Sequence, residues 1–331
     1  MLTRAPAAPD AGALFAPLAD ARGLLLAVSG GPDSMALLAL ADEWRRDHDA
    51  PVFVATVEHG LRPGSRAEAH AVAAACAARG LPHALLEWQG DKPATGLPAA
   101  ARAARYDLLA RHALEIGADT LVTAHHADDQ AETVLMRLTR GSGPAGLAGM
   151  AALAPLPGFE SAGLRLARPL LGAPKADLVA LCRTRGLAFF EDPTNADETY
   201  RRPQLRKLAA ILAAEGLGRD ALLRLAGRAG RTERALAGLI AERLATLPAQ
   251  RTAGLFEVEA PAAYALPEEG LIRLLAMEIA RIGAAAPRLE QVEALAERLR
   301  TEPQVAATLA GVRVRADARR ITLDAAPPRR T

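Results

Sequence analysis

The sequence predicts an α/β protein built on a doubly wound parallel sheet, followed by a smaller, mainly helical C-terminal domain. Two observations support this fold class. In the first 140 residues, short apolar runs alternate with longer segments at helical spacing, which is typical of βαβ units. After about residue 210 this alternation stops, and helix-forming stretches with arginine at polar positions follow.

Each of four apolar runs is expected to form a buried strand that leads into a helix. The expected strands are Arg22–Ser29, Pro51–His59, His83–Trp88 and Asp119–His125. The expected helices are Asp33–His48, Ser65–Gly80, Leu97–Gly117 and Ala127–Arg140. Glycines close the second and third of these helices, and Leu187–Phe190 is expected to add a fifth strand.

The rest of the chain predicts a loop and a second domain. Segment Arg140–Gly163 is rich in Gly, Pro and Ala and is expected to form a long loop. Helices are expected within Ile211–Leu247, 268–283 and 288–300, and an alternating tail, Gly311–Asp324, predicts a hairpin. We therefore expect a catalytic domain over residues 1–214 and a mainly helical domain over residues 215–331.

Composition limits the class of protein. The chain has 331 residues, of which 50% are hydrophobic and 24% charged, so it can bury a core and is not a disordered chain. The formal net charge is +2, but residues 201–234 alone carry +6, which favours a polyanionic partner. Cys76 and Cys182 are too few for a disulfide framework or a cysteine-ligated cluster. With no membrane-length apolar run and no signal-peptide core, we expect a cytoplasmic protein.

A glycine-rich hexapeptide stands where the first strand is expected to turn into the first helix. It reads Ser29-Gly30-Gly31-Pro32-Asp33-Ser34. Free N–H groups at a helix start attract anions, and glycines let the backbone approach them. An acid in such a loop suits a magnesium ion shared with phosphates. The alternative is a turn capped by Asp33 and Ser34 without a ligand. The hexapeptide matches neither the Walker A pattern nor G-x-G-x-x-G.

This hexapeptide resembles the PP-loop of the N-type ATP pyrophosphatases, which cleave ATP to AMP and pyrophosphate. Further stretches narrow the resemblance to the tRNA(Ile)-lysidine synthetases over residues 20–210. They are Val57–Arg62, Ala101–Tyr106, Thr123–Thr133, Arg137–Gly143, Arg168–Leu171 and Glu191–Asn195. The resemblance implies a ligase for tRNA processing that uses ATP to adenylate carbon-2 of the wobble cytidine in a CAU-anticodon isoleucine tRNA. Free L-lysine then displaces AMP to give lysidine, which changes the codon read from AUG to AUA.

The resemblance also assigns roles to individual residues. The hexapeptide, together with His125, is expected to bind ATP, while Asp33 and Asp129 handle Mg²⁺ and the amine. Glu132, three residues after Asp129 and on the same helix face, is expected to recognise lysine or remove its proton. Arg105 resembles the family arginine that meets a phosphate or the adenylated intermediate. Of the adjacent His125 and His126, we expect one to pack and one to face ATP.

A basic cluster near the end of the catalytic domain is expected to contact tRNA phosphates. It comprises Arg201, Arg202, Arg206 and Lys207. Arg202 and Arg206 match the family pattern, whereas Pro203 replaces its asparagine. A solvated arginine face is the alternative, because the chain uses 37 arginines and only three lysines. Residues 215–331 are assigned to tRNA docking by analogy, with a structural or dimerising role, and hence a homodimer, left open.

Other functions remain to be weighed against this one. A tRNA base thiolase of the same fold generally needs cysteines that Cys76 and Cys182 do not supply. A GMP synthetase would bring a glutaminase domain with a catalytic cysteine, and an NAD synthetase would use ammonia. A non-catalytic ATP-binding protein is a different class. The presence of Asp33, Asp129 and Glu132 argues against it, and turnover would separate the two.

Overall fold

The computed structural model describes residues 9–61, 64–90, 92–93, 95–190, 211–283 and 285–327. The chain divides into two compact units, Met1–Arg231 and Thr232–Thr331, and the division falls within helix α9 (Arg219–Ala245). This division describes packing only. The functional division predicted after residue 214 stays a prediction.

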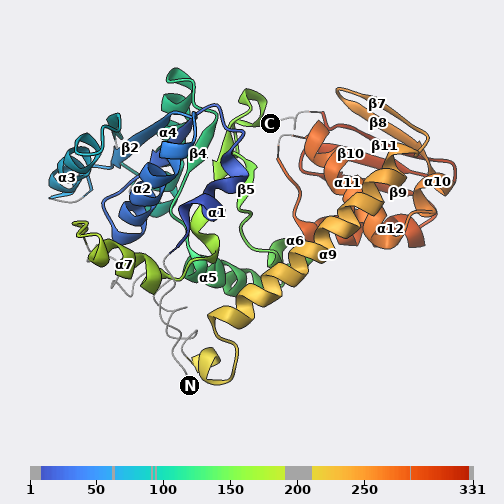
Figure 1. Cartoon of the computed structure of the whole chain (residues 1–331). Coiled ribbons are helices and arrows are strands. Elements are labelled where there is room, and N and C mark those ends of the chain that lie inside the picture. The colour runs from blue at the N-terminus through green and yellow to red at the C-terminus, as the bar shows by residue number, and fades with distance from the viewer. Residues whose placement is uncertain are drawn as a thin grey trace. The chain divides into compact units, whose positions relative to one another are not determined.

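The first unit contains a six-stranded sheet whose order is β3-β2-β1-β4-β6-β5 (Figure 1). Its strands are β1 (Leu24–Ala27), β2 (Val52–Glu58), β3 (His83–Glu87), β4 (Thr120–Val122), β5 (Leu153–Pro155) and β6 (Arg165–Ala167). All neighbours pair in parallel except β5, which is antiparallel to β6 at the edge. The doubly wound fold class is therefore confirmed, as are the four strands expected before residue 126.

The fifth strand lies elsewhere than predicted. Leu187–Phe190 is not a strand, so that prediction is wrong. Leu187 and Phe189 pack against the core, and the Phe190 N–H donates to the carbonyl oxygen of Gly30 rather than entering a ladder. The additional strands are β5, which lies in the segment predicted as a loop, and β6, just beyond it. Strand β4 is equally short but stands in the apolar run Asp119–His125, whereas β5 lies among alanines and prolines and β6 has an arginine at its start.

Helices cover both faces of the sheet, because successive strand residues point to opposite sides. Leu24 and Leu26 of β1 join one core cluster with residues of α1, α2, α3 and α7, while Leu25 joins another with α4. The helices of this unit are α1 (Ala11–Phe15), α2 (Pro32–Trp44), α3 (Ser65–Ala77), α4 (Leu97–Glu115), α5 (Ala127–Leu138), α6 (Pro144–Leu147) and α7 (Lys175–Thr184). Single 3-10 turns are η1 (Ala16–Leu18), η2 (Arg45–Asp47), η3 (Glu160–Ala162) and η4 (Pro169–Gly172).

The strand order indicates where a ligand is expected to bind. The chain runs outward from β1 through β2 to β3, then returns to the other side of β1 with β4. In open parallel sheets, ligands bind beyond the carboxyl ends of the strands where the order reverses in this way. In this protein those ends are β1, followed by the hexapeptide Ser29–Ser34, and β4, followed by His125 and the start of α5.

The second unit contains a five-stranded antiparallel sheet of order β7-β8-β11-β10-β9, the C-terminal part of α9 and the helices α10 to α12. The strands are β7 (Ala249–Thr252), β8 (Leu255–Glu259), β9 (Val305–Leu309), β10 (Val312–Ala316) and β11 (Arg320–Ala325), and the helices are α10 (Ala260–Tyr264), α11 (Glu268–Ile282) and α12 (Leu289–Thr301). The two helices predicted after residue 260 are confirmed as α11 and α12, and the hairpin as β10–β11. The sheet is larger than that hairpin, because three further strands join it.

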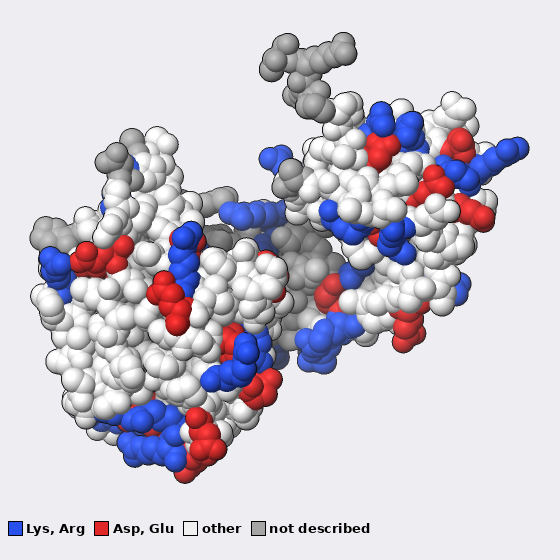
Figure 2. Space-filling view, turned by 90° about the horizontal axis from the view of Figure 1, so that it is seen from above, with Lys and Arg blue, Asp and Glu red and all other residues white. Residues whose placement is uncertain are grey.

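The N-terminal part of α9 packs on α5 within the first unit. Leu222 and Ala226 are buried in one cluster with Val134 and Leu135 of α5. On the visible faces of both units, positive and negative side chains lie together in scattered groups on a mostly uncharged surface (Figure 2). Within the described ranges, we find no helix with the length and apolar character that a membrane crossing requires.

Candidate active site

The hexapeptide forms an anion-receptive turn between β1 and α2. Gly30 has φ +87°, a left-handed conformation that favours glycine, and a Cβ there would lie 3.4 Å from the Phe190 ring. At Gly31 the nearest atoms to such a Cβ are 3.9 Å away, so space remains above the backbone. Gly31 is the N-cap of α2 and provides no side-chain cap, and Pro32 occupies the first turn. The start of α2 therefore keeps N–H groups for a ligand.

The two serines of the hexapeptide hold the turn together. Ser34 is 5% exposed, and its hydroxyl donates to the Gly31 carbonyl oxygen at 2.9 Å. The same hydroxyl oxygen accepts the Ser29 N–H at 3.2 Å. Neither serine caps the helix start, so the arrangement differs from the capped, ligand-free turn considered as the alternative. A direct contact of either hydroxyl with ATP stays a prediction.

Helix α5 begins at a histidine that acts as its N-cap. The His126 Nδ1 accepts the N–H groups of Asp128 and Asp129, and the Asp129 carboxylate accepts the His126 N–H at 3.1 Å. This reciprocal pair is a capping box. Because Nδ1 accepts, the neutral ring carries its proton on Nε2, which lies near the Asp33 and Asp129 carboxylates. The N–H groups of Asp128 and Asp129 at the start of α5 thus have an acceptor within the protein, whereas the N-cap of α2 provides no side-chain acceptor.

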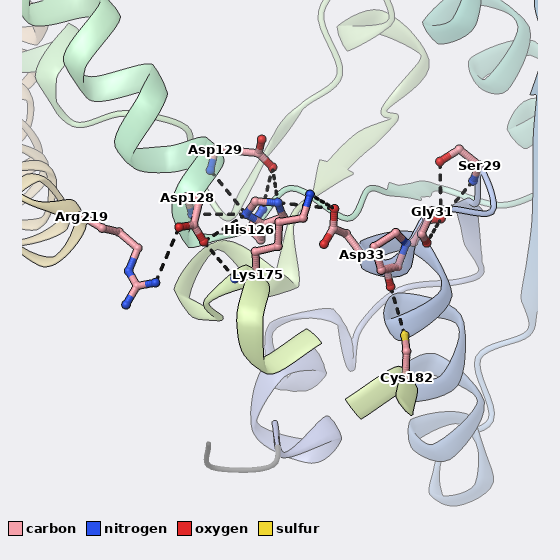
Figure 3. Close-up of polar contacts among 11 residues, drawn as sticks. Ser29, Gly31, Asp33, His126, Asp128, Asp129, Lys175, Cys182 and Arg219 are labelled. Carbon is pink, nitrogen blue, oxygen red and sulfur yellow. Dashed lines mark hydrogen bonds and ion pairs between the residues drawn. The ribbon is translucent and has the colours of Figure 1, made fainter. Parts of the chain in front are cut away.

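His126 brings together two acids from distant parts of the chain. Its Nε2 lies 3.5 Å from Asp33 Oδ2 and 3.4 Å from Asp129 Oδ2, and Figure 3 shows both carboxylates turned toward it. Burial opposes protonation of His126, but the Asp33, Asp129 and Asp128 carboxylates outweigh it and raise its pKa. Burial alone would raise the pKa of Asp33. The contacts with His126 and Lys175 lower it instead.

Two cations, Lys175 and Arg219, lie beside the aspartates that surround His126 (Figure 3). The Lys175 Nζ lies 3.6 Å from Asp33 Oδ2, and its backbone N–H donates to Asp128 Oδ2 at 2.9 Å. The Arg219 guanidinium at the start of α9 lies 3.6 Å from Asp128 Oδ1. Asp128 therefore connects the starts of α5, α7 and α9.

His125 points into a different environment from its neighbour. Its Nδ1 lies 2.8 Å from the Thr123 hydroxyl. Burial lowers its pKa, Asp129 raises it, and Arg168, Arg102 and Arg105 lower it further, giving about 4. His125 is therefore neutral at physiological pH.

Arg105 lies on α4 and is half-buried. Its charge depresses the pKa of His125, and also that of His59 just beyond β2, where burial is the larger cause. The guanidinium lies 5.5 Å from the Tyr106 ring centre. The role that the resemblance implies for Arg105, contact with a phosphate or with the adenylated intermediate, stays a prediction.

The sequence-predicted acids converge only in part. Asp33 and Asp129 meet at His126, and Glu132 follows one turn after Asp129 on α5, half-buried. Arg201, Arg202, Arg206 and Lys207, predicted to contact tRNA, lie outside the described residues. Sequence reasoning missed the central place of His126 and the contacts of Lys175 with Asp33 and Asp128. The spacing from His126 to Asp129 was the available signal, since it matches a capping box with histidine in place of serine or threonine.

Comparison with known proteins is consistent with this geometry. A family model described as a PP-loop domain matches residues 6–211. The tRNA(Ile)-lysidine synthase of Bradyrhizobium sp. (strain BTAi1) is 49% identical, with 98% of this chain and 95% of the relative covered. That of Rhodopseudomonas palustris is 47% identical, with 98% and 97% covered.

Among solved structures, the U34-tRNA thiolase NcsA from Methanococcus maripaludis superposes with a TM-score of 0.55. The match covers 66% of this chain and 76% of the thiolase at 17% identity, so it shows a shared fold alone. The lysidine synthases, in contrast, are similar over nearly their whole length. With the PP-loop between β1 and α2 and the acids of α5 beside it, the chain belongs to the tRNA(Ile)-lysidine synthase family of PP-loop proteins.

Proposed function

We propose that the chain is an ATP-dependent carbon–nitrogen ligase that joins free L-lysine to carbon-2 of the wobble cytidine in CAU-anticodon isoleucine tRNA. The products are lysidine-containing tRNA, AMP and pyrophosphate, and the modified tRNA reads AUA instead of AUG. The observation that carries this proposal is the meeting of Asp33 and Asp129 at His126, beside the uncapped start of α2. The names of the relatives supply the substrate.

ATP is the co-substrate in this proposal, and Mg²⁺ accompanies it. The Asp33 Oδ1 atom is buried and has no hydrogen-bond partner among the described residues, which suits a cation ligand. Within the described ranges, no group of three or more His, Cys, Asp or Glu side chains forms a metal site of protein ligands alone. This fits Mg²⁺, which is commonly held by one or two carboxylates together with substrate phosphates. Asp33 and Asp129 would hold it.

The reaction has two steps in this proposal. The oxygen on cytidine carbon-2 attacks the α-phosphorus of ATP, and pyrophosphate leaves. The lysine ε-amine then attacks carbon-2, and the oxygen departs with AMP. The amine is protonated at neutral pH, so a carboxylate must first take its proton. Asp129 and Glu132, one turn apart on α5, are the groups we assign to the ammonium and its proton. Arg105 is assigned to the phosphate of the adenylated intermediate.

The remaining surface serves tRNA in this proposal. Residues 1–214 carry out the chemistry, and residues 215–331 dock the tRNA. The basic cluster Arg201, Arg202, Arg206 and Lys207 contacts its phosphates. On α9, Arg224, Arg228 and Arg231 are exposed on a face away from the buried Leu222 and Ala226, which suits further phosphate contacts.

A sulfur-transfer role receives no support from the cysteines. Cys76 and Cys182 are both fully buried, and burial raises the pKa of each thiol to about 11. Neither presents the reactive thiolate that sulfur transfer requires. We therefore do not extend the thiolase activity of the structural neighbour to this chain.

The direct test is incubation with ATP, Mg²⁺, L-lysine and an unmodified CAU-anticodon isoleucine tRNA transcript, followed by nucleoside mass spectrometry. We expect a cytidine that gains the mass of lysine less water, only when ATP and lysine are both present. Pyrophosphate release without this nucleoside would support cleavage of ATP by the protein but contradict the assignment of this tRNA and lysine as its substrates. Binding of ATP without any turnover would favour a non-catalytic ATP-binding protein.

A further inference from the structure

Arg168 is an arginine that the fold holds in place without an acidic partner among the described residues. It follows β6, and its backbone N–H and its Nη1 donate to the carbonyl oxygens of Ala152 and Ala151 at 2.7 and 2.8 Å. The Nε atom is shielded from solvent and has no hydrogen-bond partner in the described part of the chain. A guanidinium has five N–H donors, so most of them are left for another acceptor.

Two further arginines, Arg102 of α4 and Arg137 of α5, act on Arg168 through their charge. Burial lowers the pKa of the Arg168 guanidinium, Tyr106 opposes this, and the charges of Arg102 and Arg137 lower it further. Arg102 donates to the Tyr106 hydroxyl at 3.4 Å, and its guanidinium lies 5.0 Å from the ring centre. Arg137 donates only to backbone carbonyl oxygens, as Arg168 does. We call Arg102, Arg137 and Arg168 the arginine cluster.

Neighbouring arginines differ from this cluster because they are paired with acids. Arg165, three residues before Arg168, lies 3.0 Å from Asp20 and 3.6 Å from Asp119. Arg111 of α4 lies 2.9 Å from Asp107. No ion pair of this kind joins the cluster to an acid within the described ranges. Cations that are partly buried without an acid cost free energy, which an anion from outside the chain would offset.

The position of the cluster favours an RNA phosphate as this anion. In the proposed reaction, ATP occupies the phosphate loop after β1. Strand β6 lies two strands away, with β4 between them, which is roughly 10 Å across the sheet. Arg102 is exposed, so a macromolecule can reach the cluster. The planar fork of a guanidinium matches the oxygens of a phosphate. A cytidine that turns its base toward ATP keeps its own phosphates in the RNA backbone, farther from the phosphate loop.

We propose that the arginine cluster binds a backbone phosphate that flanks the wobble cytidine, with Arg168 as the main contact, and so orients the base toward ATP. This proposal rests on the ligase activity proposed above. The phosphate supplies the negative charge that the protein does not place beside the cluster. Repulsion among the three arginines is therefore relieved when RNA binds, which strengthens the contact.

The test measures tRNA affinity by filter binding of the full chain to a CAU-anticodon isoleucine tRNA transcript. Arg168→Met keeps much of the aliphatic stem and removes the charge, so we expect about 10- to 100-fold weaker binding. Arg102→Met changes an exposed side chain, which protects the fold, and should weaken binding about 3- to 10-fold. Arg111→Met is the matched control on the same helix, because its arginine is paired with Asp107, and it should bind like wild type.

A second arm identifies the phosphate. The tRNA is assembled by ligation with an uncharged methylphosphonate in place of the phosphate on the 5′ or on the 3′ side of the wobble cytidine. At one of these two positions, we expect the modification to weaken binding by wild type as much as Arg168→Met does, and to cost the variant little more. Additive losses at both positions would overturn the assignment to a flanking phosphate.

Calorimetry with ATP and AMP separates an RNA phosphate from a nucleotide phosphate. Both nucleotides should bind to Arg168→Met and Arg102→Met with wild-type affinity, which also shows that the site is still folded. Weaker nucleotide binding by the Arg102 variant would overturn the RNA assignment. Wild-type tRNA affinity in both variants would overturn the role of the cluster and leave the ligase proposal standing. Failure of the wild-type chain to bind this tRNA would overturn both.

Discussion

At the scale of single residues, the adjacent His125 and His126 have pKa values that shift in opposite directions. Burial and three arginines lower the pKa of His125 to about 4, with Asp129 opposing them. Burial also acts against protonation of His126, but the carboxylates around it prevail and raise its pKa. The backbone turn between β4 and α5 separates the two rings, directing one toward arginines and the other toward aspartates.

The depressed pKa of His125 predicts a pH-dependent loss of stability. Between pH 6.5 and 4 the unfolded chain binds a proton at this residue that the folded protein does not, so the free energy of unfolding falls as the pH is lowered. His125→Gln removes this contribution, which we expect to reach about 1.5 kcal/mol between pH 6.5 and 5. Urea unfolding of both proteins across this range measures it. Parallel pH curves for wild type and variant would contradict the assignment.

Asp33 is predicted to be essential for chemistry but not for tRNA binding. Asp33→Asn keeps the size of the side chain and removes the charge that faces His126 and Lys175, so we expect AMP formation to fall at least about 100-fold. AMP is quantified by chromatography, and tRNA affinity by filter binding. A parallel loss of tRNA affinity would indicate misfolding and contradict this division of roles.

At the scale of elements, the segment after α5 is held by side chains of α5 itself. Gln130 exchanges two hydrogen bonds with the backbone of Met150, and Arg137 donates to the carbonyl oxygens of Gly146 and Gly149. Gly149 has φ +74°, and a Cβ there would lie 2.8 Å from the Gln130 amide. The glycine-rich composition thus allows a close approach to α5 instead of indicating a free loop.

This packing predicts a specific sensitivity to alanine. Gly149→Ala adds a clash with Gln130 to the cost of a left-handed residue, so we expect a loss of about 2–4 kcal/mol in the free energy of unfolding. Gly158→Ala is the matched control. Its φ is +84°, but no atom lies within 4 Å of an added Cβ, so only the backbone strain of about 1 kcal/mol is expected. Equal losses, measured by urea unfolding, would contradict the contact.

The sequence predicted long elements better than short ones. Helices such as α4 and α5 span several turns, so their spacing and closing glycines indicate their ends within a few residues. Strands β5 and β6 depend on pairing with β6 and β4, and their sequences contain no apolar run like the one that indicated β4, although β4 is equally short. Leu187–Phe190 has strand-like residues, but the neighbouring core uses them as packing surface.

The candidate site follows the same logic. Asp33 and Asp129 were predicted because the motifs that contain them resemble those of the PP-loop and lysidine synthetase families. Lys175 was not predicted as a site residue, because its approach to Asp33 depends on where Asp128 anchors α7. Contacts of this kind arise from packing between distant elements, which the local pattern does not encode.

At the scale of the whole molecule, charge is balanced overall and concentrated locally. The net charge of +2 gives little attraction for RNA, but the arginines along the first half of α9 are exposed. We expect tRNA affinity to fall steeply with salt. Replacing Arg224 and Arg228 with alanine should reduce the slope of log affinity against log salt by about 1.5–2.

The control for this prediction is Arg46→Ala, which removes an exposed arginine just beyond the C-terminal end of α2. Arg46→Ala should leave the slope of log affinity against log salt unchanged. Filter binding of tRNA across a salt series measures this slope for the wild type, the α9 double variant and Arg46→Ala. An unchanged slope in the α9 double variant would show that these arginines form only a solvated face.

The order of strands also has a consequence for synthesis on the ribosome. Strand β1 and the phosphate loop emerge first, but β4 and the acids that complete the site emerge only after β2 and β3 have been made. A nascent chain that ends before Asp129 presents a glycine turn with one aspartate. A nascent chain therefore cannot hydrolyse ATP at this site until β4 and the start of α5 have been made. We expect ribosome-bound fragments that end before Asp129 to show no ATP hydrolysis.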